Sequence, residues 1–417
     1  MPNRDKSASI VEGEAAFQQW EHHLHAFVSL CSQPDLDAVP DSATHSDLAG
    51  MTVGVKDIID VRGIPTRNGS AVCQSAAPAD DDAAVVASLR AKGARIIGKT
   101  TTTEFAFTDP ANCRNPYDLK RTPGGSSSGS GAAVAAGMVD MSLGTQTAGS
   151  LCRPAAYCGV VGFKPTYNVL PTAGVTPLAV SFDTVGIIAR SIETARTGFL
   201  MMSEMMPPVE CDKWVVASML LPTEISADEQ MQAAFLHAQH TLEETGTGVS
   251  DLKVQLATDD IVAAHRIVMT AEAAESHRHL LVPEMLSLLQ TGFRSALETG
   301  AGLSAMQVAD ARALLSEARE AFWQQLDGVD CVLTLPVPEP APLLDGTTGY
   351  QHWLTCWTVF GGPLVCLPWG LDTLGRPLSV MLATAPGRDL SLLRLAKRLE
   401  AMAPGMPAPT LPSQQKT

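Results

Sequence analysis

The sequence lacks three features that would assign it to common classes of protein. It has no run of about 18 apolar residues, so we expect no membrane-spanning helix. Its 9 cysteines form no CxxC pair, so neither a metal site nor a disulfide framework is indicated. It also lacks an excess of basic residues. The net charge of −15 argues against nucleic acid or an anionic membrane as a partner.

The first 20 residues contain no apolar core of the kind that directs export. Together with the scattered cysteines, this predicts a protein of the reducing cytoplasm. At 417 residues the chain can bury a large core as one big domain or as two.

The most informative stretch covers residues 121–165 and contains two Gly/Ser-rich turns, at 124–131 and 144–150. Glycine reaches backbone angles that are closed to other residues. Such turns can bring several backbone N–H groups close to one reacting atom, as an oxyanion hole requires. Two turns that each end near a serine therefore predict an acyl-transfer site built partly from main chain.

Residues 51–60 (MTVGVKDIID) are typical of a buried strand, but Lys56 interrupts it. One interpretation is a lysine at a strand end that reaches water with its ammonium group. The other is a desolvated lysine whose lowered pKa lets it act as a base. Such a base could take the proton of a serine through a second hydroxyl and return it to a leaving amine.

These segments resemble the signature region of the amidase signature family of serine hydrolases. The similar motifs are VGVKDIID at 53–60, IGKTTTTEFAF at 97–107 and the whole 121–165 stretch, in order and at family-like spacing. Within the family, the GTQT wording, an arginine three residues after a serine and the short chain resemble malonamidase-like members. The resemblance implies a single α/β amidase domain over 1–417, with a large twisted mixed sheet, helices on both faces and a helical insertion or cap.

The resemblance also implies a catalytic triad. Ser150 matches the nucleophile, Ser126 the bridging serine and Lys56 the base, with a cis bond between Gly125 and Ser126. It further implies an oxyanion hole from the main chain of Ser150 and of the three residues before it, Thr147, Ala148 and Gly149.

Arg153 is implied to hold a substrate carboxylate, a role that suits a guanidinium; the alternative is an arginine that ties loops together. Gly125 and Gln146 are further candidate substrate-binding positions. Gln146 replaces an acidic residue of the commoner GTDTGGS motif. Ala148 replaces a glycine of that motif, so its Cβ restricts the backbone angles φ and ψ beside the implied oxyanion hole. Cys152 lies next to this site, but proximity alone does not make a thiol a nucleophile.

The implied reaction is hydrolysis of a small carboxylic amide to an acid and ammonia or an amine, with a carboxylate-bearing amide as one option. No cofactor and no metal are expected. Two alternatives stay open: an amidotransferase-A-like subunit that works with partner chains, and a hydrolase of urea-like compounds or carbamates. A homodimer is suggested by resemblance alone.

Three rival motifs are less well supported. GSSSG at 125–129 matches the nucleophile elbow GxSxG with Ser127, but the preceding KRTPGG cannot form the buried strand that the elbow needs. GARIIGKT at 93–100 matches a phosphate loop, but its middle is strand-like. His22, His23 and His25 lack partners at metal-ligand spacing.

The pattern of the chain predicts a catalytic core at 50–195, a mostly helical insertion at 200–327 that shapes the pocket, and returning strands with a closing helix at 328–403. Helices are expected at 227–245, 261–281, 283–292, 304–326 and 390–402, and strands at 329–336 and, alternating with turns, over 353–382. His265 and His277 are expected on exposed helical faces.

Overall fold

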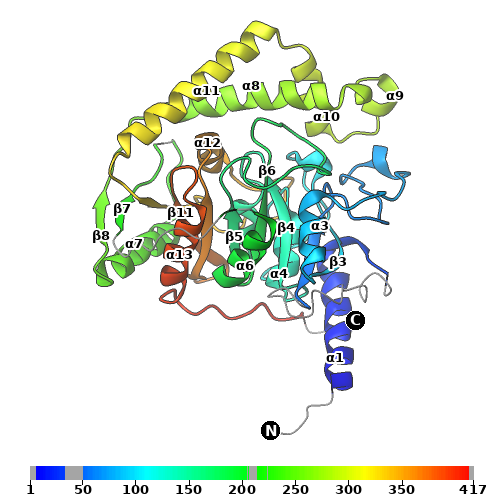
Figure 1. The fold of residues 1–417 in the computed structure, drawn as a ribbon, viewed down its shortest axis with the longest axis horizontal. Coiled ribbons are helices and arrows are strands. Elements are labelled where there is room, and N and C mark those ends of the chain that lie inside the picture. Colours follow the sequence, from blue (N-terminus) through cyan, green and yellow to red (C-terminus); the bar gives the residue numbers. More distant parts are fainter. Residues whose placement is uncertain (1–5, 33–49, 204, 206–213, 223, 413–417) are drawn as a thin grey trace.

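A single mixed sheet of eleven strands runs through the molecule (Figure 1). The computed structural model describes residues 6–32, 50–203, 205, 214–222 and 224–412. The strand order is β1-β3-β2-β4-β6-β5-β10-β11-β9-β7-β8. The strands are β1 (Phe27–Leu30), β2 (Thr52–Lys56), β3 (Arg95–Thr100), β4 (Met141–Gln146), β5 (Val161–Lys164), β6 (Thr184–Ala189), β7 (Val215–Ser218), β8 (Gly248–Asp251), β9 (Cys331–Thr334), β10 (Leu364–Leu371) and β11 (Pro377–Ala383).

Parallel and antiparallel pairs alternate in blocks across this sheet. The strands β3, β2 and β4 are parallel to one another, and so are β9, β7 and β8. The central strands from β4 to β9 pair antiparallel, as does β1 with β3. The prediction of a large mixed α/β sheet is thereby confirmed.

The described α-helices cover both faces of the sheet or lie beyond its ends. They are α1 (Lys6–Leu24), α3 (Ala84–Ala91), α4 (Ser128–Ala135), α5 (Cys152–Cys158), α6 (Ile192–Met202), α7 (Glu229–Glu244), α8 (Thr258–Ser276), α9 (Pro283–Leu286), α10 (Thr291–Ala301), α11 (Ala305–Gln325), α12 (His352–Phe360) and α13 (Asp389–Glu400). None of these described helices is long and apolar enough to cross a bilayer.

Two adjacent residues of β5 define the two faces. A Cβ on Gly162 would meet Ala155 of α5, whereas the ring of Phe163 packs edge-on against Phe199 of α6. Successive side chains of a strand point to opposite faces. The helix α5 therefore covers one face and α6 the other. The candidate site lies on the face with α5, because α5 follows Ser150 directly.

The helices α8, α9, α10 and α11 form a separate layer beyond one end of the sheet, at the top of Figure 1. The segment 200–327 is mostly helical, but it also supplies β7 and β8, which extend the sheet beyond β9. The helical layer therefore starts only at α8. The single helix expected at 283–292 is wrong. A short α9 is followed by a new helix, α10, whose first amides at Gly292 and Phe293 donate to the carboxylate of Asp109.

The strands expected over 353–382 are only partly present. Residues 352–360 form α12, and strands begin at Leu364. Every side chain of α12 after His352 is buried. A short, mostly apolar run that is buried on all sides carries no clear helical or strand period, so the sequence could not separate these two structures.

Close packing of α10 on α8 depends on Gly300, where a Cβ would overlap the carbonyl oxygen of Thr270. We predict that Gly300→Ala lowers the free energy of unfolding by about 1–3 kcal/mol, because the two helices must move apart. Gly302→Ala is the matched control. It lies two residues further along, has an ordinary helical φ of −86°, and its Cβ would come no closer than 3.5 Å to the backbone. Thermal and urea unfolding should separate the two variants. Equal stability would contradict the close packing.

Candidate active site

Lys56 and Ser126 meet at the carboxyl ends of the parallel strands β2 and β4. Lys56 ends β2, and Thr145 lies near the end of the parallel neighbour β4. The Nζ of Lys56 is 2.7 Å from the Oγ of Ser126 and 2.7 Å from the Oγ1 of Thr145. Parallel strands present their carboxyl ends at one edge, where the loops that follow them can form a site.

Burial controls the charge of Lys56. Its side chain has an exposed fraction of 0%. Desolvation lowers its pKa from 10.5 to about 7, and the nearby charge of Asp183 partly opposes this shift. The Oγ of Ser126 and the Oγ1 of Thr145, its two hydrogen-bond partners, are both uncharged hydroxyls. A substantial share of Lys56 is therefore a neutral amine near pH 7, with a lone pair that can accept a proton.

The two Gly/Ser-rich turns lie against each other. The peptide bond Gly125–Ser126 is cis, and the amide of Ser127 donates to the carbonyl oxygen of Ser150 over 3.1 Å. The structure thus brings Lys56 and Ser126 into direct contact and sets Ser150 on the adjoining turn. Ser150 is 6% exposed, at the point where the chain enters α5.

Residues 147–149, which we call the oxyanion loop, precede Ser150. The hydroxyl of Thr147 donates to Asp183 over 2.5 Å, and Asp183 also accepts the amides of Leu178 and Ala179. Burial raises the pKa of Asp183 to about 6. Ala148 is not among the described non-glycine residues with positive φ, so its Cβ adds no left-handed strain.

The side chain of Arg153 donates four hydrogen bonds to oxygens around the two turns. Its Nε and Nη2 donate to the carbonyl oxygen of Gly125, at 3.1 and 2.7 Å. Its Nη1 donates to the carbonyl oxygen of Gly349 at 2.7 Å and to Gln351 at 3.1 Å. The side chain is 1% exposed, and burial lowers its pKa to about 10. These contacts support the alternative in which Arg153 ties loops together.

Gln146 forms three side-chain hydrogen bonds. Its Oε1 accepts the amides of Leu151 and Cys152, the first donors of α5, and its Nε2 donates to Thr358 over 3.0 Å. Its side chain is buried. These contacts fit a residue that joins the turn, α5 and α12.

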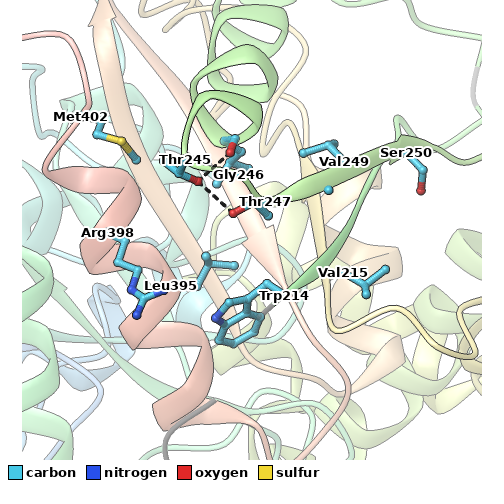
Figure 2. Close-up of a pocket in the computed structure, with 12 residues that line it drawn as sticks. Trp214, Val215, Thr245, Gly246, Thr247, Val249, Ser250, Leu395, Arg398 and Met402 are labelled. Atoms are coloured by element: carbon cyan, nitrogen blue, oxygen red, sulfur yellow. Dashed lines mark hydrogen bonds between the residues drawn. The ribbon is translucent and has the colours of Figure 1, made fainter. Parts of the chain in front are cut away.

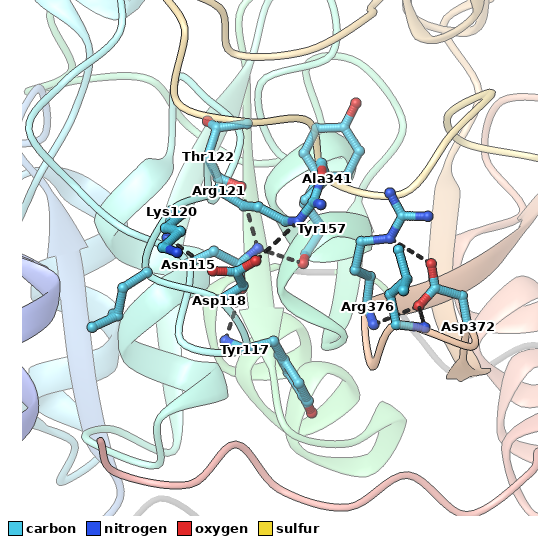
Figure 3. A network of polar contacts seen from close by, with 12 residues as sticks. Asn115, Tyr117, Asp118, Lys120, Arg121, Thr122, Tyr157, Ala341, Asp372 and Arg376 are labelled. Carbon is cyan, nitrogen blue, oxygen red and sulfur yellow. Dashed lines mark hydrogen bonds and ion pairs between the residues drawn. The ribbon is translucent and has the colours of Figure 1, made fainter. Parts of the chain in front are cut away.

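A polar network holds the segment that leads into the cis bond (Figure 3). The side chain of Asn115 donates to the carbonyl oxygens of Tyr157, at the end of α5, and Thr122. Arg121 donates to the carbonyl oxygen of Ala341 over 2.8 Å. These bonds tie the stretch that precedes Gly125 to α5 and to the loop that contains Ala341.

The rival motifs have other roles in the fold. Ser127 is buried, and its Oγ exchanges hydrogen bonds with the backbone of Thr145. Residues 95–100 of the phosphate-loop match form β3. Burial raises the pKa of the Cys152 thiol to about 12. Within the described residues, no group of three or more His, Cys, Asp or Glu side chains is placed to hold a metal ion.

Two histidines contradict their expected exposure. His265 is 2% and His277 3% exposed, and each ring nitrogen Nε2 lies 2.8 Å from a backbone carbonyl oxygen, that of Thr147 and of Pro177 respectively. Sequence reasoning missed both, because their partners lie about 100 residues away in the chain. A polar residue on a helix gives no local sign that another element will cover it.

A cavity of about 590 Å³ lies elsewhere, between β7, β8, the end of α7 and α13 (Figure 2). Its lining includes Trp214, Leu242, Val249 and Leu395 and none of the candidate site residues. This cavity is therefore separate from the candidate active site.

Known proteins share this fold and much of the sequence. The family model described as Amidase matches residues 16–393. The A subunit of the glutamyl-tRNA(Gln) amidotransferase from Anaeromyxobacter dehalogenans is 30% identical, over 97% of this chain and 95% of its own. Amidase 1 of Arabidopsis thaliana is 32% identical, over 86% of this chain and 95% of its own. A solved structure described as an amidase has a TM-score of 0.84 at 28% identity and covers 95% of both chains.

The contacts of Arg153 predict that it contributes to stability. We expect Arg153→Met to lower the free energy of unfolding by about 1–3 kcal/mol, because the buried carbonyl of Gly125 loses its side-chain donor and the half-buried carbonyl of Gly349 loses one too. Arg121→Met is the control, since Arg121 also donates to a carbonyl but lies nearer the surface. Chemical unfolding measures both. If Arg153→Met unfolds like the wild type, its donors are available for a substrate instead.

Proposed function

The chain belongs to the amidase family and is a hydrolase of amide C–N bonds, and from this we propose that it cleaves a small carboxylic amide through an acyl-Ser150 intermediate. The products are an acid and ammonia or an amine. The observation that carries the proposal is the 2.7 Å contact between the buried Nζ of Lys56 and the Oγ of Ser126. A lysine kept partly neutral by burial is a competent base at this distance.

In the proposed reaction, Ser126 passes its proton to Lys56 and takes the proton of Ser150. The Oγ of Ser150 then attacks the amide carbon, and the carbonyl oxygen becomes an oxyanion. The same relay returns the proton to the leaving nitrogen, so the C–N bond breaks and an acyl-serine remains. Water, deprotonated by the relay, adds to the ester. The bond between the acyl carbon and the Oγ of Ser150 then breaks, the relay returns the proton to Ser150, and the acid is released.

The proposed oxyanion hole consists of main-chain N–H groups of the oxyanion loop and Ser150. Fixed donors of this kind act strongly, because they are already oriented when the charge develops. The tethered Thr147 and the ordinary backbone angle of Ala148 support this assignment.

The substrate class rests on Arg153. Because its donors bind Gly125, Gly349 and Gln351, we propose a small amide that does not depend on a carboxylate. The malonamidase-like alternative, with Arg153 as a carboxylate clamp, is a direct competitor in the assay below.

A second candidate is a subunit that acts with partner chains. Similarity to an amidotransferase A subunit over 97% of this chain favours it. This candidate requires that the purified chain be inactive until partner chains are added. Activity of the chain alone on small amides favours the stand-alone enzyme.

The nucleophile is tested by ammonia release from neutral amides, malonamate-type half-amides, urea-like compounds and carbamates. We expect Ser150→Ala to lose about 10⁴–10⁶-fold in kcat, because no other group forms the acyl intermediate. Ser75→Ala, at an exposed serine, is the control. An Ser150→Ala variant as active as wild type would remove the nucleophile assignment. A strong preference for half-amides would restore the carboxylate clamp.

The lowered pKa of Lys56 predicts the pH dependence of kcat/KM. The base acts only when neutral, so kcat/KM should fall as pH drops below about 7 and level off above it. Asp183→Asn removes a negative charge that favours protonated Lys56, so the falling limb should move to lower pH. A profile that is flat from about pH 5.5 to 8.5 would argue against Lys56 as the base.

A further inference from the structure

Each carbonyl of the oxyanion loop has its own hydrogen-bond donor, and the donors come from three different helices. The Nε2 of His265, on α8, lies 2.8 Å from the carbonyl oxygen of Thr147. The hydroxyl of Thr358, on α12, donates to the carbonyl oxygen of Ala148 over 2.6 Å. The amide of Arg153, in α5, donates to the carbonyl oxygen of Gly149 over 3.0 Å.

The geometry of the peptide unit gives these contacts a consequence. In a trans peptide the C=O of one residue and the N–H of the next lie in one plane and point in opposite directions. A donor that holds the Thr147 carbonyl toward α8 therefore turns the Ala148 N–H away from α8. By the same rule, Thr358 sets the direction of the Gly149 N–H, and the amide of Arg153 sets that of Ser150.

We propose that His265 and Thr358 are positioning residues that orient the N–H groups of Ala148 and Gly149 toward a substrate oxyanion. This inference rests on the proposed function, because it assigns a role to residues around the same oxyanion hole. Neither residue touches the reacting atoms; each acts through one peptide unit of the oxyanion loop.

The environment of His265 suits a fixed donor. A carbonyl oxygen can only accept, so the Nε2 of His265 carries the proton. Burial lowers the pKa of His265 to about 4, so the ring is neutral at physiological pH. Its ring packs against Phe182 with centroids 4.3 Å apart.

The helix that carries His265 is itself anchored to the loop before β6. Glu272 of α8 accepts from both the amide and the hydroxyl of Ser181. His277 donates to the carbonyl oxygen of Pro177. The same loop ends at Asp183, which accepts the hydroxyl of Thr147. The helical layer and the oxyanion loop are thereby joined through both the main chain and the side chain of Thr147.

Gln146 fixes the direction of the Thr358 hydroxyl. Its Nε2 donates to Thr358, so the single hydroxyl hydrogen of Thr358 is free to point at Ala148. The side-chain oxygen of Gln146 holds the start of α5. This assigns Gln146 to the support of the oxyanion hole rather than to direct contact with substrate.

The test compares variants that remove a donor with variants that keep it. His265→Phe removes the donor and keeps a ring, whereas His265→Gln keeps an N–H near the Nε2 position. Thr358→Val and Thr358→Ser form the second pair. Thr241→Val is the matched control, because Thr241 of α7 is a buried threonine whose hydroxyl also donates to a backbone carbonyl oxygen, that of His237, outside the oxyanion loop.

We expect His265→Phe and Thr358→Val each to lower kcat by about 10²–10³-fold, the usual loss for one oxyanion donor, with little change in KM. The Gln and Ser variants should recover most of this loss, and Thr241→Val should retain kcat. A small aldehyde inhibitor that forms a tetrahedral adduct should weaken in parallel with kcat. Losses no larger than that of Thr241→Val, or losses carried by KM, would overturn the proposal.

A crystal structure of His265→Phe separates this inference from the proposed function. Rotation of the Thr147–Ala148 peptide supports the positioning role, and an unchanged peptide overturns it, whatever the activity. Failure of the proposed function has a different signature, in which wild type and Ser150→Ala give the same ammonia release on every amide offered.

Discussion

The burial of Lys56 among hydroxyl groups is the constraint on which the rest of the site depends. A second buried lysine, Lys99, lies on the neighbouring strand β3 and pairs with Val55, the residue before Lys56. Lys99 forms an ion pair with Asp57 at 2.9 Å, and both side chains are buried. Two lysines on adjacent strands thus have opposite environments. The paired one is neutralised by a carboxylate, whereas Lys56 contacts Ser126 and Thr145, which stabilise its charge far less.

The contact between Lys56 and Ser126 requires the two Gly/Ser-rich turns, 124–131 and 144–150, to stay packed against each other. Glycines allow the backbone conformation of these turns, and polar side chains around them keep the turns in place. Arg153 binds the carbonyl of Gly125 beside the cis bond, Asn115 ties the incoming segment to α5, and Gln146 holds the start of α5. Buried polar groups of this kind stabilise a fold only when their partners are present, and these three side chains have them.

The helical layer of α8 to α11 also contacts the candidate site directly. His265 reaches from α8 to the oxyanion loop, and Glu272 and His277 hold α8 on the loop that ends at Asp183. The helical layer is therefore linked by hydrogen bonds to the loop that is proposed to stabilise an oxyanion. Substitutions that shift α8 are expected to alter the oxyanion loop as well.

The sequence by itself determined the class of the fold and the segments of the site. Lys56, Ser126 and Ser150 are predicted as a triad because they lie in short motifs that resemble those of the amidase signature family. The tertiary structure decided what the residues between them contact. In the folded chain, Arg153 hydrogen-bonds the carbonyl of Gly125, and Gln146 hydrogen-bonds Thr358. His265 is buried against the carbonyl of Thr147. The segment 352–360 forms the helix α12, where a strand was predicted. Those outcomes depend on partners far away in the chain. Local patterns record the period of an element, but not which distant group will meet its side chains.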